Sequence, residues 1–130
     1  MTTFSMVPEQ SDGDITREVA TDLTGKEYYF GKDSSGLLVL AGAGEKALGI
    51  IQEGVLGTTT SRKITRVRTS GISRLKLAGT VSVGSWIKSD SDGKGVATTT
   101  DHDVYNAQAL SDGVAGDIIA VKVITGTVSA

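Results

Sequence analysis

The sequence has no cysteine, so neither a disulfide nor a thiolate metal site can stabilise the fold. It has one proline among 130 residues, and aromatic residues make up only 5% of them. No run approaches the roughly 20 apolar residues that a transmembrane helix needs, so we expect no membrane partner. A single domain of this length must therefore build its core from Val, Ile, Leu and Ala.

An excess of basic charge is also lacking. The net charge is −2, whereas binding to phosphates needs a basic footprint, so we expect no nucleic-acid partner. The first residues, Met1 to Phe4, show neither the basic start nor the apolar stretch of a secretory signal. This predicts synthesis in the cytoplasm.

Glycine is abundant, at 17 residues, and it supplies the positive φ angles that tight turns require. Turn signals separate many short apolar or alternating runs, a pattern typical of β-sandwiches and β-barrels. The runs lie at 28–30, 37–40, 48–51, 64–69, 75–77, 81–83, 86–87 and 118–124. The sequence therefore predicts an all-β fold, a small β-barrel or β-sandwich.

Residues 1–24 have a different character from the rest of the chain. They are polar and show little periodicity, and their turn signal is Ser11-Asp12-Gly13-Asp14. We predict that residues 1–24 form an extended N-terminal arm that takes its order from a neighbouring molecule, and that residues 25–130 form the β domain.

The second half of the chain repeats the order of features in the first half. Residues 30–36 (FGKDSSG) resemble residues 87–93 (IKSDSDG), and Glu53-Gly54-Val55 resembles Asp112-Gly113-Val114. One such unit cannot hide both its apolar face and its edges, so two related β units packed together are expected. Residues 100–110 fit either one helical turn or a strand, and the repeat favours a strand.

The motifs that could hold a ligand each have a simpler structural explanation. Asp90-Ser91-Asp92-Gly93 lacks the later ligands of a calcium loop and fits a β-turn better. The segment 41–47 (AGAGEKA) lacks the spacing of a phosphate-binding loop and is interpreted as an inter-strand loop. His102 is the only histidine and lies between two acids, as expected for a surface residue. No catalytic residue, cofactor or metal ligand is therefore assigned.

Charge is unevenly distributed along the chain. No acidic residue occurs between Gly54 and Ser89, although that segment holds many of the 13 basic residues. Two interpretations remain open: a basic face that docks on an acidic protein surface, or a solvated strand pair whose charges are neutralised by acids from other segments. The candidate docking residues are Arg62, Lys63, Arg66, Arg68, Arg74 and Lys76.

The single tryptophan, Trp86, also has two interpretations. A buried core anchor is the simpler one. An interface hot spot is the alternative, because tryptophan is enriched at such positions.

The stretch from Lys26 to Val128 resembles the bacteriophage head decoration, or capsid cement, proteins. The likeness lies in the order of three segments. An Ala/Gly-rich loop leads through Leu48-Gly49-Ile50 to the Glu53-Gly54-Val55 turn. Residues 78–87 (AGTVSVGSWI) then precede an Asp-Ser-Asp-Gly-Lys turn, and residues 107–118 (AQALSDGVAGDI) lead into the last alternating run.

The resemblance implies a non-enzymatic structural protein of the virion that binds the outer surface of the capsid. Its partners would be the major capsid protein and copies of itself, often as trimers. Such a protein stabilises the head shell by bridging neighbouring capsomers, and the arm would order on the shell or on a neighbouring copy. Two alternatives remain: a carbohydrate- or receptor-binding β module of a phage tail, and a tail-tube or head-completion subunit.

Overall fold

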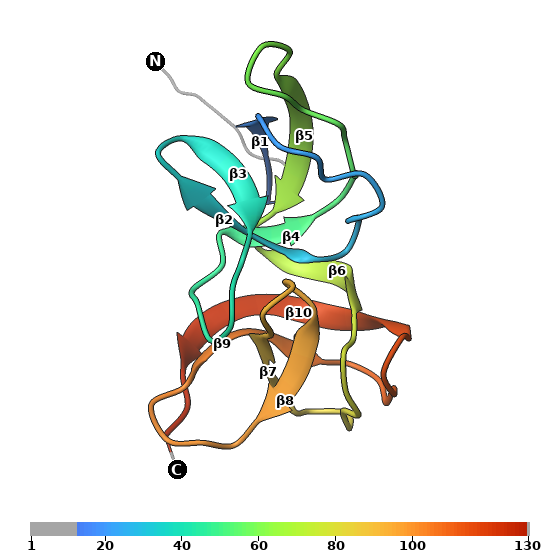
Figure 1. Cartoon of the computed structure of the whole chain (residues 1–130). Helices are drawn as coiled ribbons and strands as arrows, with labels where there is room; N and C mark the ends of the chain where they lie inside the picture. The colour runs from blue at the N-terminus through green and yellow to red at the C-terminus, as the bar shows by residue number, and fades with distance from the viewer. Residues whose placement is uncertain (1–12, 130) are drawn as a thin grey trace, which may run out of the picture.

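The computed structural model describes residues 13–129, which form ten β-strands and no helix (Figure 1). The strands are β1 (Asp14–Val19), β2 (Phe30–Ser34), β3 (Leu37–Leu40), β4 (Gly49–Ile51), β5 (Lys63–Arg68), β6 (Gly71–Lys76), β7 (Trp86–Ser89), β8 (Gly95–Thr98), β9 (Val104–Ala109) and β10 (Ile118–Thr127). The predicted all-β class is confirmed. This part of the chain contains no helix long and apolar enough to cross a membrane.

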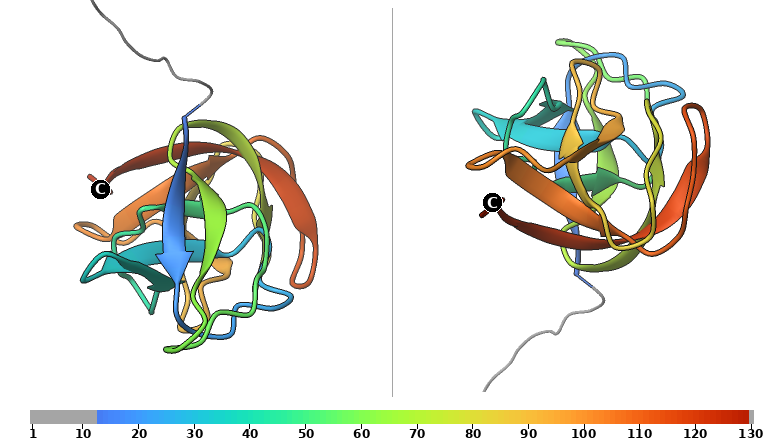
Figure 2. Two further views of the ribbon diagram at one scale, coloured as in Figure 1. Left: turned by 90° about the horizontal axis from the view of Figure 1, so that it is seen from above. Right: turned by 90° about the horizontal axis from the view of Figure 1, so that it is seen from below.

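The strands fall into two sheets of five. The first has the order β1-β3-β2-β4-β5 and closes into a barrel, because β1 pairs along its length with β5 and in parallel with β3 through Glu18 and Leu37. The second has the order β6-β10-β9-β7-β8, and one parallel bridge between Leu77 and Gly95 joins its two ends. We refer to β1–β5 and β6–β10 as the first and second units. Figure 2 views the molecule from the side of each unit in turn.

The two units share one topology. Each strand of the first unit, from β1 to β5, has its counterpart in the same order from β6 to β10, with the same antiparallel partners. Corresponding backbone groups also agree in detail. Tyr28 and Gly84 both have positive φ (69° and 88°), and their N–H groups donate to Ile51 and Ala109 carbonyls at 2.7 and 2.8 Å. The predicted pair of related β units is confirmed.

Two local predictions can be compared with these elements. Residues 104–109 form β9, so the strand predicted within 100–110 is confirmed. The predicted arm is wrong over its second half, because β1 pairs with β5 over six residues and both Val19 and Leu23 are buried. Residues 1–12 of that arm lie outside the described residues. The structured first unit therefore begins well before Gly25.

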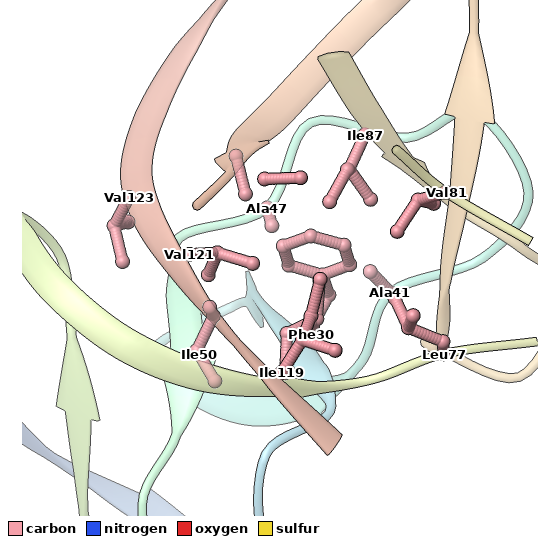
Figure 3. Packing of buried hydrophobic residues seen from close by; sticks show 13 residues of the cluster. Phe30, Ala41, Ala47, Ile50, Leu77, Val81, Ile87, Ile119, Val121 and Val123 are labelled. Atoms are coloured by element: carbon pink, nitrogen blue, oxygen red, sulfur yellow. The ribbon is translucent and has the colours of Figure 1, made fainter. Parts of the chain in front are cut away.

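The two units share one hydrophobic core. Phe30 begins β2 in the first unit, yet its fully buried ring packs among side chains of the second unit (Figure 3). Its backbone N–H donates to the Gly93 carbonyl at 2.7 Å, which ties β2 to the β7–β8 turn. A separate cluster around Val19, Leu38 and Ile51 fills the interior of the first barrel. The second core is thus completed by a side chain from the first unit.

The loop between β3 and β4 reinforces this junction. The expected inter-strand loop is present, and its Gly44 N–H donates to the Ser89 carbonyl at 2.9 Å. Asn106 on β9 is 2% exposed, and its amide makes two bonds to the loop. The Asn106 Oδ1 accepts from Ala47 N–H, and its Nδ2 donates to the Glu45 carbonyl, both at 3.0 Å. One buried amide thus satisfies two backbone groups of the other unit.

Asn106→Ala should destabilise the whole protein. It leaves the Ala47 N–H and the Glu45 C=O without their partner, and each unsatisfied buried group costs about 1–3 kcal/mol. We expect urea denaturation to show a loss of about 2 kcal/mol or more. Gln108→Ala on the same strand removes one exposed side-chain bond and should cost less than about 1 kcal/mol. Equal losses for the two variants would contradict this role for Asn106.

Candidate docking surface

The six candidate docking residues lie on or beside two strands that belong to different units. Lys63, Arg66 and Arg68 are on β5, Arg62 directly precedes it, and Arg74 and Lys76 are on β6. Alternation along each strand turns every second side chain outward. Arg62, Arg66 and Arg68 therefore lie on the outer face of β1 and β5, and Arg74 and Lys76 lie on the outer face of β6 and β10. Lys63 alternates with these arginines and is on neither outer face, although it is exposed at the start of β5.

On the outer face of β1 and β5, the basic side chains have acidic partners. Arg68 binds the Asp14 carboxylate with two nitrogens, Nε at 2.7 Å and Nη2 at 3.1 Å, and Arg66 Nη1 approaches the same carboxylate to 3.0 Å. Arg62 pairs with Glu18 at 3.3 Å. The hydrogen bond from Arg68 is the main reason that the pKa of Asp14 lies below its ordinary value, and burial opposes it. For these arginines, the interpretation of charges neutralised by other segments is the correct one.

The outer face of β6 and β10 differs. In register, Arg74 lies opposite Ala120, Lys76 opposite Ile118, and Lys122 opposite Ile72. The three cations make no ion pair with any residue in 13–129. Ile72 and Ile118 are 63% and 48% exposed. This surface, which we call the basic face, therefore combines unpaired cations with exposed aliphatic side chains.

A hollow of about 310 Å³ opens where the basic face meets the first unit. The Arg74 guanidinium stands 6.0 Å from the centre of the Tyr28 ring, which forms one side of the hollow. The Gln52 amide joins the two units here by donating to Ser73 Oγ at 3.0 Å. The lining residues are Tyr28, Gln52, Arg68, Ile72, Ser73, Arg74 and Ala120. Cationic, aromatic and aliphatic groups thus converge in one concave place.

The remaining sequence motifs fall outside this surface. Asp90 Oδ1 accepts from the N–H groups of Asp92 and Lys94 at 2.9 and 2.8 Å, so the predicted turn is confirmed. The His102 side chain is 88% exposed, which confirms the predicted surface position. Among residues 13–129, no group of three or more His, Cys, Asp and Glu side chains could hold a metal ion.

Trp86 fits neither interpretation fully. It is half-buried and stacks on Tyr105, with ring centroids 4.1 Å apart and an angle of 21° between the planes. It is therefore not a core residue like Phe30. Its ring is covered on one face by a side chain of its own unit.

Sequence reasoning missed Lys122, Ile118 and the hollow. Lys122 lies in an alternating run, and that alternation was the signal that places Lys122 on the same face as Ile118. The neighbouring strand could not be assigned from the sequence. Only the register of β6 against β10 brings Arg74 and Lys76 beside these residues.

Comparison with known proteins gives a structural relative and no sequence relative. No protein-family model and no curated protein matches the sequence, so membership of the capsid decoration family is not confirmed. The head fiber gp8.5 N base of bacteriophage phi29 has a similar fold, with a TM-score of 0.71 and 11% sequence identity. The match covers 85% of this chain and 94% of that chain. At this identity the likeness establishes the fold.

Asp14→Asn should lower the free energy of unfolding at pH 7 by about 1 kcal/mol, because it removes the charge from a two-point Arg68 bond. Since the folded-state pKa of Asp14 is lowered, its contribution is present above the unfolded-state pKa and is lost as pH falls through the folded-state pKa. Urea denaturation at pH 7 and at about pH 3 should therefore show a difference between wild type and variant that shrinks in acid.

Asp33→Asn is the matched control. Asp33 also faces an arginine, Arg17 at 3.5 Å, but its side chain is 42% exposed. Such exposed pairs contribute little, so this variant should match the wild type at both pH values. A difference for Asp14→Asn that stays constant across the pH range would contradict the ion-pair explanation.

Proposed function

We propose that this chain is a non-catalytic structural protein of a phage head, which docks on the outer surface of the shell and stabilises it by bridging neighbouring capsomers. The observation that supports the proposal most directly is the fold. Two β units with a shared core match the base of a phage head fiber over 94% of that chain. The independent resemblance of residues 26–128 to capsid decoration proteins points to the same place in a virion.

The surface chemistry fits a docking role. The described part of the chain carries a concave hollow and a face with unpaired cations, both formed by the two-unit body. Electrostatic complementarity sets the register and the association rate of such contacts. Many copies on one shell multiply a contribution of a few kcal/mol each, so modest individual contacts can stabilise a large lattice. The major capsid protein is the proposed partner, and assembly into trimers stays a prediction.

The similarity to a fiber base favours a second candidate function. In that case the chain would anchor another structure to the head and leave the strength of the shell unchanged. Both functions require binding to the head. They differ in whether bound protein raises the temperature at which the shell ruptures.

The test uses heads of the same phage that lack this protein. Purified full-length chain is added, sedimented with the heads and then heated with them. We expect saturable binding and a higher rupture temperature. Saturable binding without a shift would favour the fiber base. An absence of binding would overturn both functions and lead next to a glycan screen for the receptor-binding alternative.

A further inference from the structure

The two units provide an internal comparison of one surface. The ladder between β1 and β5 pairs Asp14 with Arg68, and the matching ladder between β6 and β10 pairs Ile72 with Lys122 at the corresponding position. Arg68 also lies opposite Ile50 of β4, and Lys122 lies opposite Gln108 of β9, which is the counterpart of β4. The same place in the fold thus holds an acid–base pair in one unit and an aliphatic–cation pair in the other.

The other positions of the two ladders show the same difference. Where β1 has Thr16 and Glu18, β6 has Arg74 and Lys76. The first unit therefore neutralises its outer face with acids from its own first strand. The second unit has no acid on the corresponding strand, β6.

Aliphatic side chains lie among the cations of the basic face. Ile72 and Ile118 are exposed, and Ala120 lies between them on β10 beside Arg74. Leu110 extends this row, because its N–H donates to the Ala120 carbonyl at 3.0 Å and its side chain is 42% exposed. A surface of this kind matches a protein partner that offers both carboxylates and apolar groups.

We propose that the basic face, formed by Ile72, Arg74, Lys76, Ile118, Ala120 and Lys122, is the surface that binds the shell, and that its occupant is an acidic patch of the capsid protein. The inference rests on the proposed function. It retains Arg74 and Lys76 from the six candidate docking residues and adds Lys122. It removes the three arginines that already pair with Asp14 and Glu18, and Lys63, which lies outside the basic face.

The hollow provides a specific point of contact. The Arg74 side chain makes no ion pair with any residue described, its guanidinium lies over the Tyr28 ring, and both residues line the hollow. A partner carboxylate that enters the hollow can therefore bind Arg74, with the Tyr28 ring on one side and Ile72 nearby. A planar guanidinium binds a carboxylate through two hydrogen bonds, which fixes both position and orientation.

Two other occupants are disfavoured. A nucleic-acid duplex would need many contacts between basic side chains and phosphates. Half of this face is aliphatic, however, and the whole chain has a net charge of −2. A second copy related by a two-fold axis would bring Arg74, Lys76 and Lys122 against the same cations. An acidic protein patch has neither disadvantage.

The test compares two triple variants of the full chain in the head-binding assay. Arg74→Glu/Lys76→Glu/Lys122→Glu reverses the basic face. Lys46→Glu/Lys63→Glu/Lys94→Glu changes the net charge equally at three lysines outside that face, which also make no described ion pair. We expect the first variant to bind at least about tenfold more weakly and the second to stay within about threefold of the wild type.

A single substitution on the surface distinguishes a loss of binding from a loss of folding. Ile72 is 63% exposed, so Ile72→Ser should leave the melting temperature unchanged and still weaken binding severalfold. If both triple variants bind alike, and Ile72→Ser binds as the wild type does, the basic face is not the docking surface although the proposed function stands. If the wild type does not bind heads, the proposed function fails, and this inference fails with it.

Two further outcomes would overturn the choice of occupant. One is tight wild-type binding to duplex DNA that the face reversal abolishes. The other is an oligomer of the free wild-type chain, seen by sedimentation, that the same reversal dissociates. A wild-type chain whose affinity for heads falls with salt, together with a reversed variant that has lost this salt dependence, would support the acidic partner.

Discussion

The burial of Phe30 is the contact on which the rest of the structure depends. The first unit has a core cluster of its own around Val19, Leu38 and Ile51, whereas the core of the second unit includes side chains from the first. The second unit closes through one bridge between Leu77 and Gly95, and the space that remains is filled by Phe30 from the first unit. The β3–β4 loop and Asn106 then fix the relative position of the units. The hollow is lined by residues of both units and opens where the basic face meets the first unit.

The two units share a topology, but corresponding positions in them hold different residue types. Phe30 lies opposite Ile50 in the first unit, and Trp86 lies opposite Gln108 in the second. Phe30 and Ile50 are buried against the neighbouring unit. Trp86 is stacked instead on Tyr105, and Gln108 replaces the apolar partner with an amide. At these positions the second unit is thus more polar than the first.

The sequence was sufficient to predict strands, turns and duplication because these leave local signals: alternation, glycine at positive φ, and repeated order. Residues 14–24 escaped prediction for a physical reason. Asp14 and Glu18 make that stretch look polar, yet they are the carboxylates that neutralise Arg68 on the neighbouring strand β5 and Arg62 directly before it. Pairing between segments far apart in the chain is fixed by register, which composition does not reveal. Lys122 was missed because its position beside Ile72 is likewise fixed by the register of β6 against β10.

The contrast between the two outer faces separates stability from binding. In the first unit, the Asp14 ion pairs add side-chain links to the six-residue ladder between β1 and β5. In the second unit, β6 and β10 are held by an equally long ladder over buried Leu75 and Val121, and their outer side chains make no ion pair among the described residues. The cations on the outer face of β6 and β10 repel one another weakly in water, and a bound carboxylate offsets this repulsion. A duplicated fold can therefore use one copy of a surface for its own stability and leave the other available to a partner.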